Sequence, residues 1–167
     1  MSDDVTNQPP PLTGGNAWRG DPLLIQLADE FSEPVRRDLD ALGRFVLTHE
    51  AQDLARLANS ELPKLRTHDR QGRRLDQVEF HPAYHALMRR SVANGLHSSI
   101  WENGDAEIGR RHQVRAARFY LTAELETGHL CPITMTSASL AALMASPKLF
   151  REWAPRITTR KYDQSQK

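Results

Sequence analysis

The most constraining feature of this sequence is a stretch without charged side chains, which runs from Leu130 to Ser146. It contains Pro132 and four serine or threonine residues before Leu140, and it is shorter than the ~20 apolar residues that a membrane span requires. Residues Ile133 to Ala145 are expected to form a helix. A helix that offers no charged face to water is normally buried on all sides. We therefore expect it at the centre of the fold, or under another domain or subunit.

Signals for the start of a helix recur along the rest of the chain. Asp21 before Pro22 is an N-cap followed by a proline in the first helical position, and Pro34, Thr48 and Pro82 open further helices. No segment alternates strictly between apolar and polar residues, so a sheet is not expected. The expected helices cover residues 23–31, 34–46, 48–59, 82–99, 110–128, 133–145 and 147–153.

The remaining segments are expected to be irregular. Residues 1–20 are rich in proline and glycine and predict an extended arm, while 61–79, with Pro63 and mixed charges, predict a long surface loop. The sequence therefore indicates an all-α fold, a helical bundle of about seven helices over residues 21–155. Residues 156–167 follow as a linker.

The composition narrows the class of function. Lys and Arg total 22 against 21 Asp and Glu, which disfavours a dedicated nucleic-acid-binding domain. The Arg-rich stretches 66–74 and 110–118 lack interleaved aromatic residues for base stacking, so a solvated or inter-subunit charged face is favoured over phosphate contacts. The single cysteine, Cys131, excludes an internal disulfide framework and suits a reducing compartment. The acidic N-terminus has no apolar signal-peptide core, so we expect a cytoplasmic protein without membrane contact.

One carboxylate in the helix over 110–128 stands out. A polar stripe runs along one side of this helix, and Glu124 lies nearly opposite, on the side of Ala117 and Leu121. The stripe consists of Arg111, Arg115, Arg118 and Thr122. Burial of an unpaired carboxylate raises its pKa and costs several kcal/mol. Either a buried hydroxyl or arginine satisfies Glu124, or the residue lines a pocket without a salt bridge.

Two histidine motifs could hold a metal. His81 and His85 are four residues apart at a helix start, but without a third ligand an N-cap and a packed surface histidine are favoured. Glu126 and His129 have the Glu-x-x-His spacing of di-iron bundles, which need a second copy and two further glutamates. No metal site is expected.

Three segments extend the reading beyond residue chemistry: the Asn7–Leu12 arm segment Asn-Gln-Pro-Pro-Pro-Leu, residues 69–85, and residues 116–136 with the run Glu126-Thr127-Gly128-His129-Leu130-Cys131-Pro132-Ile133-Thr134. Together they resemble the N-terminal part of the acyl-CoA dehydrogenase superfamily, in its AidB branch of adaptive-response flavoproteins. The resemblance implies a much longer protein, with a β-domain that binds FAD, a C-terminal helical domain and a homotetrameric assembly. The present chain is then expected to be a fragment, whose linker leads toward the flavin-binding domain.

The resemblance also implies where a substrate would lie. The catalytic glutamate base and the flavin-contacting Met-Thr segment of the family lie beyond residue 167, so neither a catalytic residue nor bound FAD is expected in this chain. The residues expected to line a pocket for an acyl-CoA-like ligand are Glu124, Gly128, Cys131, Thr134 and Met135. The helix over 133–145 would be covered by the other domains.

Two other functions stay open. A stand-alone helical interaction module without a cofactor would use the uncharged helix as its binding surface. The family's link to DNA alkylation damage invites a DNA-binding function, but the near-neutral charge places such a surface elsewhere in the full protein.

Overall fold

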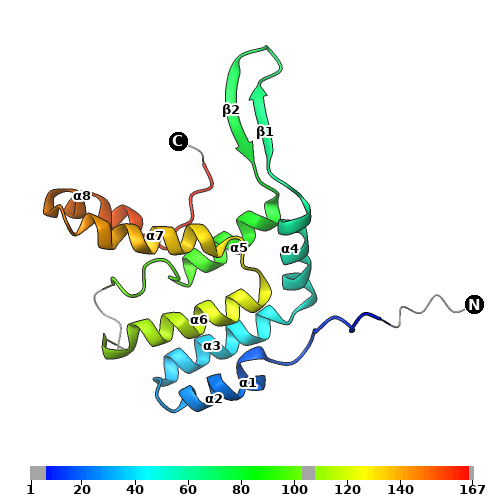
Figure 1. The fold of residues 1–167 in the computed structure, drawn as a ribbon, viewed down its shortest axis with the longest axis vertical. Helices are drawn as coiled ribbons and strands as arrows, with labels where there is room; N and C mark the ends of the chain where they lie inside the picture. The colour runs from blue at the N-terminus through cyan, green and yellow to red at the C-terminus, as the bar shows by residue number, and fades with distance from the viewer. Residues whose placement is uncertain (1–6, 103–107, 166–167) are drawn as a thin grey trace, which may run out of the picture.

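The computed structural model describes residues 7–102 and 108–165, which form a helical bundle from which one β-hairpin projects (Figure 1). Its α-helices are α1 (Ala17–Gly20), α2 (Pro22–Ala28), α3 (Glu33–Val46), α4 (His49–Ser60), α5 (Pro82–Ala93), α6 (Arg111–Leu125), α7 (Leu130–Leu143) and α8 (Pro147–Ile157). Strands β1 (Lys64–His68) and β2 (Arg74–Glu79) lie between α4 and α5, and the 3-10 helix η1 (Ile108–Arg110) precedes α6. The all-α class is confirmed, with eight α-helices in the described ranges.

The predicted helix starts are confirmed by their capping bonds. Asp21 Oδ1 accepts from the backbone N–H groups of Leu23 and Leu24 at 2.8 and 3.1 Å, and Thr48 Oγ1 accepts from Ala51 at 3.1 Å. His81 caps α5 in the same way, through its ring nitrogen. Each cap satisfies an amide that has no partner within its helix.

The helix ends differ from the prediction. α5 ends at Ala93 instead of running to residue 99, because Gly95 takes a left-handed conformation with φ 67°. The N–H of Leu96 then donates to Ser91 O at 3.1 Å, which closes a C-terminal capping motif. At the other end of the chain, α8 continues past Trp153 to Ile157. The first helix, α1, forms within the stretch that was expected to be an extended arm.

The expected loop over 61–79 is instead an antiparallel hairpin, so the prediction of a loop was wrong. Lys64 pairs with Glu79 and Leu65 with Val78, and the register shifts between Arg66 and His68. Figure 1 shows the hairpin standing clear of the helices. Since no face of this ribbon is buried, nothing in its sequence selects for the apolar alternation by which a half-buried strand is recognised.

The main core lies between α1, α2, α3 and α6. Its buried members are Trp18, Leu24, Phe31, Val35, Leu39, Leu42, Val46, Val114, Ala117 and Leu121. α1 can approach α3 closely because Gly43 has no side chain, and a Cβ there would lie 2.5 Å from the backbone nitrogen of Trp18. A second cluster joins α5 to α7 through Met88, Val92, Leu96, Leu130 and Ile133.

The arginine stripe of α6 faces inward, contrary to the solvated or inter-subunit face that was expected. Arg118 is buried and donates to Asp38 Oδ2 at 2.7 Å. Arg115 is half-buried and donates from Nε to the carbonyl oxygen of Leu96 at 2.6 Å. These acceptors allow the guanidinium groups to lie at helix contacts, with their alkyl stems covered.

α7 is only partly buried, which corrects the expectation of burial on all sides within this chain. Leu130, Ile133, Ser137 and Leu140 face the bundle, and α8 packs alongside. The opposite face is open, and the Met135 side chain is 65% exposed. Within the described residues, no helix is both long enough and apolar enough to cross a membrane.

Candidate functional site

The five residues that were expected to line a substrate pocket divide into two places. Glu124 is in the last turn of α6 and lines a cavity beneath the N-terminal arm. Gly128 is in the turn between α6 and α7, and Cys131, Thr134 and Met135 lie on the open side of α7, all of them exposed. These four are not among the lining residues of the arm cavity.

The burial expected for Glu124 was wrong, because its side chain is exposed. Its helical angle does continue the buried face of Ala117 and Leu121. At this end of α6, however, the packed helices give way to the arm cavity, of about 620 Å³. Burial raises the pKa of Glu124, and the carboxylate of Asp21 raises it further. Glu124 forms no salt bridge with any residue that the structure describes.

The carboxylate that is buried is Glu126, two residues later. Its Oε1 accepts from the N–H of Gly128 at 2.5 Å and from Asn59 Nδ2 at 3.3 Å, and its Oε2 accepts from the N–H of His129 at 3.0 Å. Burial opposes ionisation, but these donors outweigh it and hold the pKa of Glu126 below its ordinary value. Gly128 is required beside this carboxylate, because a Cβ there would lie 2.7 Å from Oε1.

A serine and a histidine extend this arrangement into the core. His129 Nδ1 lies 2.5 Å from Glu126 Oε2, and His129 Nε2 lies 2.8 Å from Ser91 Oγ. An ionised carboxylate can only accept, so Nδ1 carries the proton and Nε2 accepts from the Ser91 hydroxyl. We call Asn59, Ser91, Glu126 and His129 the buried network.

The buried network has the order of a hydrolase triad but not its exposure. Ser91, His129 and Glu126 are 3%, 1% and 6% exposed, so no substrate can reach the serine. The arrangement instead fixes the α6–α7 turn against α4 and α5. Sequence reasoning considered Glu126 and His129 as a metal motif and missed this role. The signal was their i, i+3 spacing across a glycine at which α6 cannot continue.

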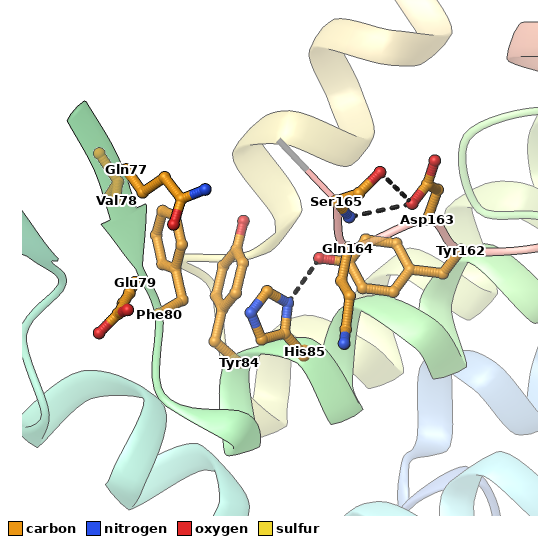
Figure 2. Close-up of a pocket in the computed structure, with 10 residues that line it drawn as sticks. All are labelled: Gln77, Val78, Glu79, Phe80, Tyr84, His85, Tyr162, Asp163, Gln164 and Ser165. Atoms are coloured by element: carbon orange, nitrogen blue, oxygen red, sulfur yellow. Dashed lines mark hydrogen bonds between the residues drawn. The ribbon is translucent and has the colours of Figure 1, made fainter. Parts of the chain in front are cut away.

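An aromatic cavity of about 580 Å³ lies between the hairpin base, the start of α5 and the C-terminal tail (Figure 2). Phe80 stacks on Tyr84 with ring centroids 4.5 Å apart, and His85 meets Tyr84 edge-on at 5.6 Å. His85 Nδ1 is 2.8 Å from Tyr162 Oη, which ties the tail to α5. The sequence gave no indication that Tyr162, in the expected linker, would complete this row.

The aromatic cavity is electrostatically connected to the turn before α7. Burial raises the pKa of Tyr84, and the nearby Glu126 and Cys131 raise it further. Burial lowers the pKa of His85, and the charge of Arg89 contributes to this shift. Tyr84 is therefore a hydrogen-bond donor and His85 is neutral near pH 7. The cavity offers aromatic surface and a few polar groups, a composition that suits ligand contact.

The two histidines considered as metal ligands have other partners. His81 caps α5, as the favoured alternative held, and His85 contacts Tyr162. Over residues 7–102 and 108–165, the structure contains no group of three or more His, Cys, Asp or Glu residues that could hold a metal ion.

Comparison with solved structures assigns this fold to a class. The chain resembles the crystal structure of Caenorhabditis elegans ACDH-11 in complex with C11-CoA, with a TM-score of 0.76 over 96% of this chain and 29% of that chain. Sequence identity in that match is 23%, so it establishes the fold alone. The fold is that of the N-terminal helical domain of acyl-CoA dehydrogenases.

Sequence comparison then identifies the family. Residues 7–164 match the model of the adaptive response protein AidB N-terminal domain, and the chain belongs to this family. It is 41% identical to the putative acyl-CoA dehydrogenase AidB of Escherichia coli (strain K12) over 95% of this chain, and 28% identical to acyl-CoA dehydrogenase family member 11 of C. elegans over 87% of it. The chain spans only 29% and 25% of the lengths of these relatives.

Proposed function

We propose that this domain forms one wall of the acyl-substrate and flavin cleft in an AidB-type acyl-CoA dehydrogenase, and part of that protein's oligomer contact. Membership of the AidB N-terminal family and the short span relative to whole relatives support this. The observation that carries the proposal is the open, uncharged face of α7.

The open face of α7 has the character of a surface that another structure covers. Met135 and Met144 are 65% and 59% exposed, and the helix between them carries no charge. Contiguous apolar surface of this kind is uncommon on a monomeric protein and marks interfaces or ligand grooves. Cys131 and Thr134 lie on the same helix, next to the turn held by the buried network.

The aromatic cavity is a second part of the proposed wall. Tyr84 belongs to this cavity and responds to both Glu126 and Cys131, so the cavity and the start of α7 are neighbours. Aromatic rings and a thioether-bearing helix are suited to contact a planar ring or an acyl chain. The buried network would hold these groups in place without touching the ligand.

The residues described here do not fit a complete FAD site. The FAD diphosphate needs basic side chains or a glycine-rich loop of backbone amides, and the open face of α7 offers neither. We infer that FAD, the cofactor that the family implies, would be held by other parts of a longer protein. The domain would contribute packing and exclusion of water, with the acyl-CoA-like ligand meeting Cys131, Thr134 and Met135.

Assembly and biological role follow as parts of the same proposal. The whole protein would be a homo-oligomer, a tetramer by the family resemblance, and would belong to the response to DNA alkylation that the family name describes. The balanced charge of this domain locates DNA contacts elsewhere. The alternative, a cofactor-free interaction module, would use the same face of α7.

A chimera tests the proposal and distinguishes the alternative. This chain replaces the matching N-terminal part of the E. coli relative, and bound FAD is measured by absorbance after dialysis. We expect close to one FAD per chain, and loss of at least half of it in the chimera carrying Met135→Lys.

The matched control for this chimera is Leu65→Lys on the hairpin, because Leu65 is 64% exposed and Met135 is 65% exposed. The control variant should retain its FAD. A folded chimera that binds no FAD, or one in which Met135→Lys and Leu65→Lys behave alike, would contradict the role in the cleft.

A further inference from the structure

The arm cavity lies away from the open face of α7 and has mostly apolar walls. They are formed by Leu12 of the arm, Ala17 of α1, Pro22 of α2, and Val46 and Leu47 at the end of α3. The arm is held over the cavity by a hydrogen bond from the N–H of Gly14 to Leu47 O, at 2.8 Å. A volume of about 620 Å³ is within the range of cavities that hold small molecules.

Three of the four polar side chains in this cavity are already committed to the fold. Asn16 Nδ2 donates to Asp40 Oδ1 at 2.9 Å, and Gln52 Nε2 donates to Val46 O at 2.8 Å. Asp21 caps α2 and also accepts from the hydroxyl of Tyr120 at 2.9 Å. These groups shape the cavity, but their bonding capacity is largely used.

Glu124 is the uncommitted member. It forms no hydrogen bond or ion pair with the described part of the chain, although it lines a largely apolar space. No lysine, arginine or histidine is among the lining residues, so the charges of Glu124 and Asp21 are not balanced within the cavity. Burial and Asp21 both raise the pKa of Glu124, and a bound cation would relieve both effects.

We propose that the arm cavity binds a primary aliphatic amine, with the ammonium group on Glu124 and the hydrocarbon chain against Leu12, Ala17, Val46 and Leu47. An anion such as a free acyl carboxylate is the wrong ligand for this site, because it would meet two negative charges. The site is separate from the proposed cleft, since its lining shares no residue with the open face of α7 or the aromatic cavity. It therefore stands whether or not the cleft proposal does.

Calorimetric titration of the 167-residue chain with n-octylammonium at pH 8 tests this inference. We expect saturable binding at one site. Octanoate and 1-octanol have the same chain length without the positive charge, and both should bind at least about fivefold more weakly, the ratio that one exposed ion pair supports.

Variants of the cavity separate the head group from the hydrocarbon chain. Glu124→Gln should weaken n-octylammonium binding about fivefold and remove its advantage over 1-octanol. Leu12→Ser should weaken the amine and the alcohol alike, by about threefold, because it removes apolar contact only. The control Glu61→Gln changes an exposed glutamate outside the cavity and should leave binding unchanged.

Circular dichroism confirms that each variant keeps its helices. The inference is overturned if n-octylammonium shows no saturable binding, if 1-octanol or octanoate binds equally well, or if folded Glu124→Gln binds the amine like the unmodified chain.

Discussion

At the scale of single residues, two glutamates at the end of α6 behave oppositely. Glu126 accepts from the backbone of Gly128 and His129 and from Asn59, and it lies in the protein interior. Glu124 is exposed and has no such partner in the described chain. The difference comes from the backbone: α6 ends at Leu125, and the extended conformation of Glu126, with φ −162°, turns its carboxylate toward the next turn.

Exchange of each glutamate for glutamine should show this difference as stability. Glu126→Gln places an amide NH2 where one carboxylate oxygen accepts backbone N–H groups, and should lower the free energy of unfolding by about 2–3 kcal/mol. Glu124→Gln should change it by less than about 0.5 kcal/mol. Urea unfolding followed by circular dichroism measures both. Equal losses in the two variants would contradict the assignment of the buried network.

The pH dependence of stability should follow His129. Burial lowers the pKa of His129 below its ordinary value of 6.5, although Glu126 opposes the shift. The unfolded chain therefore takes up this proton more readily than the folded protein. The stabilising contribution of neutral His129 is present above pH 6.5 and is lost as the pH falls below it.

Unfolding free energies measured between pH 7.5 and 5.5 test this sign. The unmodified chain should lose up to about 1.4 kcal/mol per pH unit for each extra proton that the unfolded state binds. His129→Gln should reduce this slope, whereas His112→Gln, at an exposed position of α6, should leave it unchanged. An identical slope in the unmodified chain and in His129→Gln would contradict the burial of a neutral imidazole.

At the scale of secondary-structure elements, the hairpin is the part that depends least on the rest. Its strand residues are exposed except Leu75, which is half-buried, and a two-stranded ribbon is marginally stable by itself in water. Removal of residues 66–77 in favour of a Gly-Gly link should therefore leave the helical circular dichroism and the melting temperature of the bundle nearly unchanged. A fall of more than about 5 °C would show that the hairpin contributes about 1 kcal/mol or more.

How far the sequence predicted these elements depends on where their information lies. Helix starts were predictable because Asp21, Thr48 and His81 act within their own first turn. The end of α5 and the hairpin were missed, since the first depends on Gly95 and the second has no buried face. The pocket role predicted for Glu124, Gly128, Cys131, Thr134 and Met135 stays a prediction, while the inward turn of Arg118 required knowledge of Asp38, far away in sequence.

At the scale of the whole molecule, the account centres on α7. The chain covers 29% of the length of its E. coli relative, and the face of α7 turned away from the bundle is uncharged and exposed. If the remainder of an AidB-type protein packs on this face, the same residues that are open in this chain must become protected there. Cys131 is the single cysteine and lies exposed at the start of α7, where its thiol reports on that protection directly.

The most direct test is the rate at which a maleimide modifies Cys131, followed by mass spectrometry of the peptide that contains it. The rate is compared between this chain and the chimera in which it replaces the N-terminal part of the E. coli relative. We predict rapid modification of the isolated chain and a rate at least about tenfold lower in the chimera, because burial removes access of the reagent to the thiol. Equal rates in the two proteins would show that the open face of α7 stays uncovered, and would contradict its role as a wall of the cleft.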